Sequence, residues 1–248
     1  LNLDERGWVR SLAPGQTAYT VFFHDTAKFQ GSLARRYVVQ YEGTGRLEYG
    51  ELAKLVERGD HRDLIEIETG LGNATLTLAS TDPNDYIRNI RINPEGLQPK
   101  PGEIFNPIFL ERLKGYRAVR FMIWMLGESS DDIAARRWSN RPVPQDAIWT
   151  VKGAPVEIMV ALSNQLGADP WFSLPHAADD DYVRRFAEVV RDRLDPALRA
   201  HIEFSNEVWN GQYPQARYCR DLGLALGLST NSYQAQMRYY SLRSRQIF

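Results

Sequence analysis

The hydrophobic pattern of this chain changes its period near residue 100, and this change limits the folds open to it. Before that point, apolar and polar residues alternate in short runs separated by glycines, which is the pattern of strands that bury one face. Residues 1–96 therefore predict an antiparallel β-sandwich or jelly roll, with a short helix over 51–58 as a weaker local alternative. The runs that carry the two-residue period are 19–23, 37–41, 65–68 and 75–78.

After a linker expected at 97–106, residues 107–248 alternate between helical and strand patterns. Buried strands separated by amphipathic helices indicate a parallel sheet. Only three such strands are visible, whereas a complete eight-stranded barrel takes about 250 residues. The predicted fold class is therefore a partial (β/α)8 (TIM) barrel with an N-terminal or inserted β-sandwich, an α/β plus β chain. The expected strands are 118–125, 171–176 and 200–204, and the expected helices are 107–114, 155–166, 179–194, 213–226 and 230–248.

Composition excludes several classes of protein. The 248 residues carry a formal net charge of −1 with both signs interspersed, which gives no basic surface for nucleic acid or acidic lipid. No apolar run reaches the roughly 18 residues of a membrane-spanning helix, so membrane insertion is not expected. Cys219 is the only cysteine, which rules out an intrachain disulfide or a cysteine metal site, and no cofactor or metal is predicted.

Residues 199–210 are the most informative part of the sequence. The expected strand 200–204 delivers Asn206 and Glu207 to its C-terminal end, and Trp209 and Asn210 follow. A carboxylic acid can protonate a glycosidic oxygen, an amide can hold a sugar hydroxyl, and an indole face can stack on a sugar ring. The Asn-Glu pair alone is a weak signal, but strand, Asn-Glu and Trp-Asn together are moderately specific for carbohydrate chemistry.

The two preceding strands also end in polar or aromatic residues. The first carries Arg120 and has Trp124 near its end, and the second ends at His176. Parallel strands place these ends on one edge, where the pockets of α/β sheets lie. Each residue also has a structural explanation: an ion pair for Arg120, a backbone hydrogen bond for His176, and core packing for the tryptophans. Acidic residues at 179–181 fit a helix start better than a catalytic cluster, and Cys219 fits packing better than a nucleophile.

At these residues the chain resembles the large clan of retaining glycoside hydrolases with (β/α)8 barrels, in which the fourth strand ends in Asn-Glu. The sequence segments 120–122, 175–182 and 203–210 resemble the corresponding segments of bacterial secreted members of that clan. The resemblance implies that Glu207 is the general acid/base and Asn206 the hydroxyl binder, with His176, Arg120, Trp124, Trp209 and Asn210 as substrate-binding residues. It also implies a carbohydrate substrate and an extracellular or periplasmic location.

One departure from the clan is important. A retaining mechanism needs a second carboxylate about 5–5.5 Å from the first, and in the clan it comes from the seventh strand. Residues 215–248 read as helix, so the nucleophile is not expected within this chain. The sequence also begins without an initiator Met or a signal-peptide pattern and stops inside an expected helix. We therefore expect an internal fragment, with a missing C-terminal segment or a second chain completing the barrel.

Two functions follow as alternatives. The first is a retaining glycoside hydrolase acting on a β-linked polysaccharide or oligosaccharide. The second is a noncatalytic carbohydrate-binding or cell-surface protein with a degenerate barrel. An esterase has little support, because the sequence contains no Gly-x-Ser-x-Gly elbow.

Overall fold

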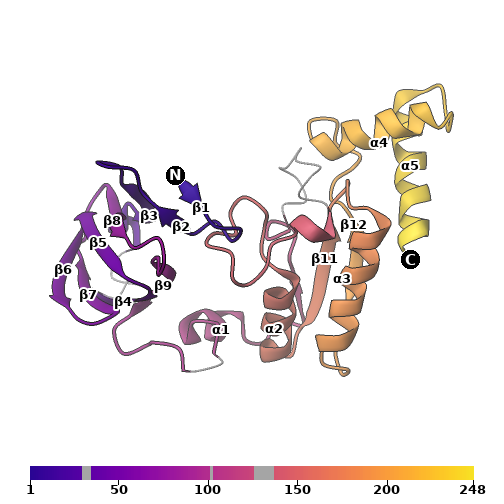
Figure 1. Ribbon diagram of the computed structural model, residues 1–248. Helices are drawn as coiled ribbons and strands as arrows, with labels where there is room; N and C mark the ends of the chain where they lie inside the picture. Colours follow the sequence, from indigo (N-terminus) through magenta and orange to yellow (C-terminus); the bar gives the residue numbers. More distant parts are fainter. Residues whose placement is uncertain (30–34, 101–102, 126–136) are drawn as a thin grey trace. The chain divides into compact units, whose positions relative to one another are not determined.

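The computed structural model describes residues 1–29, 35–100, 103–125 and 137–248. The chain divides into two compact units (Figure 1). The first unit comprises Leu1–Phe109 together with the short segment Gln145–Ala147, and the second comprises Leu110–Pro144 and Ile148–Phe248. The division therefore falls within helix α1 (Pro107–Leu113).

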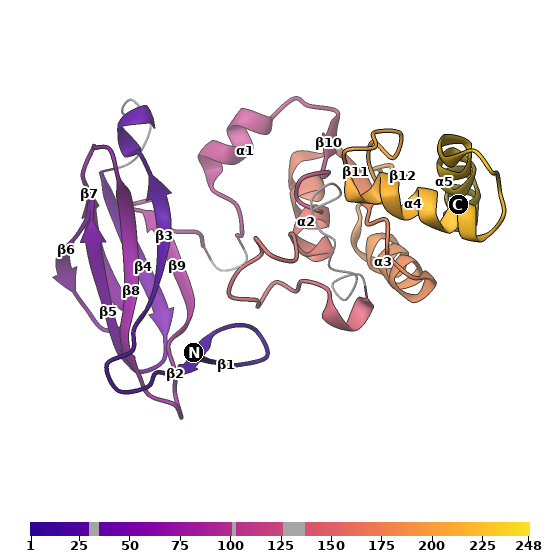
Figure 2. The same ribbon diagram turned by 90° about the horizontal axis from the view of Figure 1, so that it is seen from above.

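Two antiparallel sheets make up most of the first unit (Figure 2). One has the strand order β3-β8-β5 and the other the order β6-β7-β4-β9. The strands are β3 (Ala18–His24), β4 (Arg36–Glu42), β5 (Gly45–Glu51), β6 (Ala53–Arg58), β7 (Arg62–Ile67), β8 (Asn73–Thr81) and β9 (Arg88–Pro94), preceded by the hairpin β1 (Asn2–Leu3) and β2 (Val9–Ser11), with a 3-10 turn η1 (Thr26–Phe29) after β3.

Apolar side chains from both sheets share one core. Val39 and Ile65 come from the four-stranded sheet, Leu47 and Leu76 from the three-stranded sheet, and all four are buried in the same cluster. Alternation along each strand produces this core, because successive side chains point to opposite faces. The weaker helical alternative over 51–58 is not formed: Glu51 ends β5, and Ala53–Arg58 form β6, which pairs with β7 at an edge of the sheet.

The first unit also holds a segment from much later in the chain. The indole of Trp8 donates a hydrogen bond to the carbonyl of Gln145 (3.1 Å), and the backbone N–H of Ala147 donates to the carbonyl of Arg6 (2.9 Å). The guanidinium of Arg6 lies 3.8 Å from the carboxylate of Asp146. The turn between β1 and β2 thus binds the segment Gln145–Ala147 on both its backbone and its side chains.

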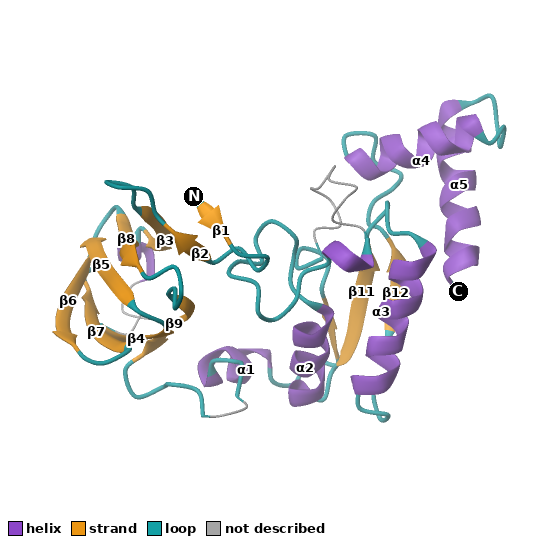
Figure 3. Ribbon diagram, viewed as in Figure 1, coloured by secondary structure: helices purple, strands orange, loops and turns teal. Residues whose placement is uncertain are grey.

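The second unit is built on three parallel strands in the order β10-β11-β12. Figure 3 shows β11 and β12 with helices α2 and α3 beside them. Along the chain, α2 lies between β10 and β11, and α3 lies between β11 and β12. Strand β11 lies in the centre, with its Trp171 paired to Arg120 of β10 and to His201 of β12. The elements are β10 (Ala118–Arg120), the 3-10 turn η3 (Trp138–Asn140), α2 (Val156–Leu166), β11 (Asp169–Leu174), α3 (Asp180–Arg193), β12 (His201–Phe204), α4 (Pro214–Ala225) and α5 (Ser232–Ile247).

The predicted fold class, a partial (β/α)8 barrel with a β-sandwich, is wrong. The described residues form a mixed fold of several antiparallel sheets and five α-helices. Strands and helices alternate only from β10 to β12 in the described part of the chain, so the sustained alternation typical of such a barrel is not evident. Two local features account for the difference. The strand expected over 118–125 ends at Arg120, and the buried residues Phe121 and Met125 then close a turn through a 2.9 Å backbone hydrogen bond. After β12, helices α4 and α5 follow one another directly and pack together.

The acidic residues at 179–181 begin α3, as the sequence predicts. The carboxylate of Asp179 accepts a hydrogen bond from the backbone N–H of Tyr182 (2.8 Å) and pairs with Arg137. Asp180 and Asp181 occupy the first turn of the helix. Negative charge at this position is stabilised by the free N–H groups and by the positive end of the helix dipole.

Replacing Asp179 with alanine is expected to lower the free energy of unfolding by about 1 kcal/mol at neutral pH, as for other lost N-caps. The hydrogen bond from Tyr182 and the nearby Arg137 lower the pKa of Asp179. A lowered folded-state pKa means that the contribution is present above the unfolded pKa of about 3.9 and is lost as the pH falls through the folded value. Urea unfolding of both proteins at pH 7 and in acid should show the difference shrinking in acid. An equal difference at both pH values would contradict this account.

Candidate active site

The ends of β11 and β12 lie on the same edge of the parallel sheet. The backbone N–H of Ser205 donates to the carbonyl of Leu174 (2.7 Å), which extends the β11–β12 pairing to the last residue of β11. His176 lies two residues after the end of β11. Asn206 and Glu207 lie two and three residues after the end of β12. The sequence placed all three residues at this edge from the position of the strand ends alone.

The backbone that carries Glu207 has an unusual conformation. Ser205 and Glu207 have φ angles of 61° and 43°, in the left-handed region that few residues other than glycine adopt. Each such residue costs on the order of 1–3 kcal/mol, and the surrounding structure must enforce it. Part of that enforcement comes from α4, because the buried amide of Gln215 donates to the carbonyl of Asn206 (2.8 Å). From α5, the amide of Gln236 donates to the carbonyl of Val208.

Asn206 is buried, and its side-chain oxygen accepts a hydrogen bond from Arg120 of β10. The distance from Arg120 Nη2 to Asn206 Oδ1 is 2.6 Å. The same Nη2 atom also donates to Glu203 Oε2 at 2.7 Å. A charged residue in an apolar strand needs an ion-pair partner, and the partner of Arg120 is Glu203. Glu203 lies within β12, one residue before its end, and is not the proposed acid/base Glu207.

Glu203 belongs to a polar cluster that is not among the residues predicted from the sequence. Its Oε2 atom also accepts hydrogen bonds from the Trp171 indole (3.1 Å) and the Ser173 hydroxyl (3.3 Å). The guanidinium carbon of Arg120 lies 4.9 Å from the centre of the Trp171 ring. The signal was present in the sequence, because Trp171, Ser173 and Glu203 occupy alternate positions of apolar strands and so share one face of the sheet.

Glu207 lies half-buried beside the turn that follows β12. The side-chain amide of Asn210 donates to Glu207 Oε2 (3.3 Å), and the backbone N–H of Asn210 donates to the carbonyl of Glu207 (2.9 Å). Between them, Val208 is buried in a cluster with Phe204, whereas Trp209 is 57% exposed. An exposed indole next to a carboxylate is the arrangement expected of a stacking surface, and it removes core packing as the explanation for Trp209.

His176 and Trp124 occupy different surroundings. His176 is buried, and its ring packs edge-on against Tyr218 of α4 with the ring centres 5.1 Å apart. Trp124 lies in the turn after β10, where its ring contacts Phe121 at 5.5 Å and its carbonyl accepts from the N–H of Ala154 (2.7 Å). Contacts to neighbouring core residues thus position both rings. For Trp124 these contacts favour the packing explanation.

No protein-family model matches this chain, and neither a curated protein nor a solved structure matches it. The glycoside hydrolase assignment therefore stays a prediction from the residues and from the resemblance. Within the described ranges, no group of three or more histidine, cysteine or acidic side chains is arranged to hold a metal ion. None of the described helices is both long enough and apolar enough to cross a membrane.

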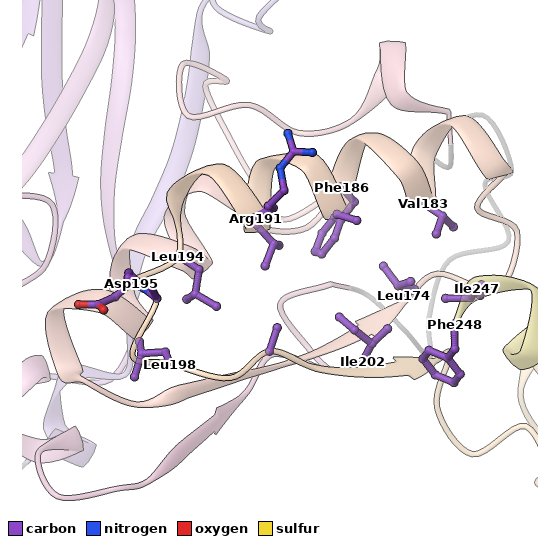
Figure 4. A pocket seen from close by; sticks show the side chains of 14 residues that line it. Leu174, Val183, Phe186, Arg191, Leu194, Asp195, Leu198, Ile202, Ile247 and Phe248 are labelled. Atoms are coloured by element: carbon purple, nitrogen blue, oxygen red, sulfur yellow. The ribbon is translucent and has the colours of Figure 1, made fainter.

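An apolar groove lies on the other face of the sheet. It has a volume of about 380 Å³ and runs between α3 and strands β11 and β12 (Figure 4). Leu174 and Ile202 line it, and these residues alternate with Ser173 and Glu203, which face the opposite way. Its lining is mostly aliphatic and aromatic, and Arg191 and Asp195 are its charged members. The side chains best suited to catalysis lie at the polar edge of the sheet, at Asn206 and Glu207.

Cys219 is expected to be inert to thiol reagents in the folded protein. It is fully buried in the cluster of Phe204 and Val208, and burial raises the pKa of its thiol to about 12. Only the thiolate is nucleophilic, so its population at neutral pH is negligible. Titration with a chromogenic disulfide reagent should show no reaction in buffer and one thiol per chain in denaturant. Rapid reaction of the native protein would contradict the packing role.

Proposed function

We propose that this chain carries the acid/base part of a retaining glycoside hydrolase site that acts on a β-linked polysaccharide or oligosaccharide. Glu207 would first protonate the departing glycosidic oxygen and then, as a carboxylate, remove a proton from the attacking water. The observation that carries the proposal is the left-handed turn that holds Glu207 at the sheet edge, directly after an amide fixed by Arg120. Strained backbone of this kind is concentrated at active sites.

The surroundings of Glu207 suit a sugar ligand. The exposed indole of Trp209 offers an apolar surface for the C–H face of a pyranose ring. Asn206 and Asn210 supply side-chain amides on either side of Glu207 in the sequence, and amides hydrogen-bond sugar hydroxyls. His176, Arg120 and Trp124 complete the predicted substrate-binding set. The contacts of Arg120 and His176 support a role in building the site, whereas those of Trp124 favour core packing.

The mechanism needs a second carboxylate about 5–5.5 Å from Glu207. Glu203 is committed to Arg120, Trp171 and Ser173, so it is poorly suited to attack a sugar carbon. A further segment of the protein or a second chain would supply the nucleophile. A secreted location, extracellular or periplasmic, would bring such a site to polysaccharide substrates.

The alternative is a noncatalytic carbohydrate-binding protein. It is favoured by the same exposed Trp209, because a stacking surface serves binding with or without hydrolysis. The left-handed backbone at Ser205 and Glu207 fits either function, because such conformations occur at ligand clamps as well as at active sites.

The two functions can be distinguished by incubating the full-length protein with a panel of α- and β-linked glycans and measuring the release of reducing ends. We expect release of reducing ends from a β-linked member, and proton NMR should show the β-anomer as the first product. Binding of the same glycan without any release would favour the alternative. First formation of the α-anomer from a β-linked substrate would contradict a retaining mechanism.

A further inference from the structure

Two buried glutamines hold the turn that carries Glu207. The side-chain amide of Gln236, on α5, donates to the carbonyl of Val208, the residue after Glu207. The side-chain amide of Gln215, on α4, donates to the carbonyl of Asn206, the residue before it (2.8 Å). Backbone carbonyls on both sides of Glu207 are therefore fixed by the helices that follow β12, and between them the backbone has a φ of 43°.

Helix α5 also holds the loop that follows His176. Arg243 donates from Nη2 to the carbonyl of Ala178 (3.0 Å) and from Nη1 to the carboxylate of Asp180 (2.6 Å). The side chain of Arg243 is only 11% exposed, whereas that of Asp180 is 90% exposed. A charged group buried to this extent needs partners, and the backbone of the loop supplies one of them. Arg243 thus anchors the segment between β11 and α3 to α5.

The residues that make these contacts lie on one face of α5. Gln236 and Arg243 are seven residues apart, which is close to two turns of helix. Tyr239 and Tyr240 follow Gln236 by three and four residues and so share that face. The ring of Tyr240 packs against Phe204, the last residue of β12, with the ring centres 6.0 Å apart. One helix face therefore reaches the end of β12 and both of the loops.

Aromatic rings connect α5 to His176 through α4. Tyr239 packs edge-on against Tyr218 of α4 at 6.2 Å, and Tyr218 packs edge-on against His176 at 5.1 Å. The two helices pack together (Figure 1) and come closest at Gly223, where an added Cβ atom would lie 2.2 Å from the carbonyl oxygen of Ala235. This contact requires glycine and leaves α5 no room to shift toward α4.

We propose that α5 is the positioning element of the site: Gln236 fixes the turn that carries Glu207, and Arg243 fixes the loop that follows His176. The inference rests on the proposed function, since it concerns the placement of the same acid/base. A misplacement of about 1 Å can cost about 10²-fold in rate, so a helix that binds both loops by their backbone preserves activity. If the two side chains only satisfied buried carbonyls, their loss would change stability alone.

The first experiment asks whether Gln236 holds the left-handed turn, and it needs no substrate. Glycine adopts a positive φ without strain, whereas alanine does not. Glu207→Gly should therefore melt about 2–4 °C above Glu207→Ala. Gln236→Met removes the amide at nearly constant size and lets the turn relax, so in its presence this difference should fall by more than half. An unchanged difference would overturn the role of Gln236.

Gln234→Met is the matched control for Gln236→Met. Gln234 lies exposed on the same helix, so its replacement should leave the difference between glycine and alanine at position 207 unchanged. If Gln236→Met does not fold, Gln236→Asn takes its place. Asparagine keeps the amide but is one methylene shorter, so it should not reach the carbonyl of Val208.

The second experiment measures hydrolysis of a β-linked oligosaccharide by the full-length protein. Gln236→Met should lower kcat by about 10–100-fold and change KM by less than about twofold, because it displaces the acid and not the groups that bind the sugar. An aryl glycoside with a strongly acidic phenol leaves without protonation, so its bond cleavage should be nearly unaffected. An equal loss with both substrates would show a general structural defect and overturn the positioning role.

Arg243→Met should weaken binding. The loop after His176 loses both of its bonds to α5, so the affinity for β-linked oligosaccharides of glucose, xylose or mannose should fall by about tenfold, as for one hydrogen bond to the ligand. Arg245→Met, at an exposed position of the same helix, is the matched control and should retain full affinity. Full affinity in the Arg243 variant as well would overturn the role of Arg243.

The outcomes separate this inference from the proposed function. Absence of binding and hydrolysis of all the oligosaccharides by the original protein would overturn the proposed function, while the melting experiment would still decide whether Gln236 holds the turn. Hydrolysis by the original protein, with no loss in Gln236→Met or Arg243→Met, would support the function and overturn the positioning role of α5.

Discussion

Replacing Glu207 with glutamine is expected to abolish glycoside hydrolysis by the full-length protein and to leave oligosaccharide binding nearly unchanged. Glutamine keeps the size of the side chain and an oxygen that accepts from Asn210, which lies 3.3 Å away in the original protein. It cannot give a proton to the departing oxygen. General acid–base catalysis contributes about 10²–10⁴-fold to rate, so a loss of that size is expected in kcat. Reducing-end assays and calorimetric titration measure the two quantities.

The leaving group of the substrate makes this test more specific. An aryl glycoside with a strongly acidic phenol leaves without protonation, so its bond cleavage should be far less affected in the Glu207 variant than that of a natural glycan. Glu188→Gln on the exposed face of α3 is a matched control and should retain full activity, because Glu188 pairs with the exposed side chain of Arg184 on the same helix. An equal loss for both types of substrate, or no loss at all, would remove Glu207 from the acid/base role.

Phe172→Ala is expected to cause the largest loss of stability, about 3–5 kcal/mol, as for other aromatic residues truncated in a core. Phe172 is fully buried in the central strand β11. Its ring stacks on Phe121 at 5.7 Å and packs edge-on against Phe186 of α3 at 5.1 Å. Removing it would leave a cavity where the sheet meets α3. Chemical denaturation followed by circular dichroism gives the free energy of unfolding.

Tyr233→Ala is the control for this measurement. Tyr233 lies in the first turn of α5 and is 57% exposed, so its removal should change the free energy of unfolding by less than about 0.5 kcal/mol. Similar losses for the two variants would mean that Phe172 does not occupy the core of the second unit. A loss for Phe172 alone would confirm the packing of sheet against helix that sets the position of the site.

Local structure in this chain follows closely from the sequence. Helices α2, α3, α4 and α5 begin and end within about two residues of their predicted bounds, because each has an apolar stripe and a recognisable start. Strand β10 was too long in the prediction, since the apolar residues after Arg120 are buried equally well in a turn. The early end of β10 is also one reason why the predicted fold class failed. The other is that α4 and α5 follow one another without a strand between them.

The site shows the same division between local and long-range information. Strand ends could be found from the sequence, so Asn206 and Glu207 were placed at the sheet edge correctly. The bonds from Arg120 to Glu203 and Asn206 join residues 83 and 86 positions apart and depend on the order of the strands. The left-handed angles of Ser205 and Glu207 carry no sequence signal, because neither residue type is typical of that region.

The contact between the β1–β2 turn and the segment Gln145–Ala147 sets an order of events during synthesis. The first unit is discontinuous, so it stays incomplete on the ribosome after Phe109 has been added. At 5–20 residues per second, the remaining stretch to Ala147 takes about 2–8 s. For that time the indole of Trp8 has no partner from Gln145. A nascent chain arrested before residue 145 should therefore present an N-terminal turn that proteases cleave, and one arrested well beyond it should protect that turn.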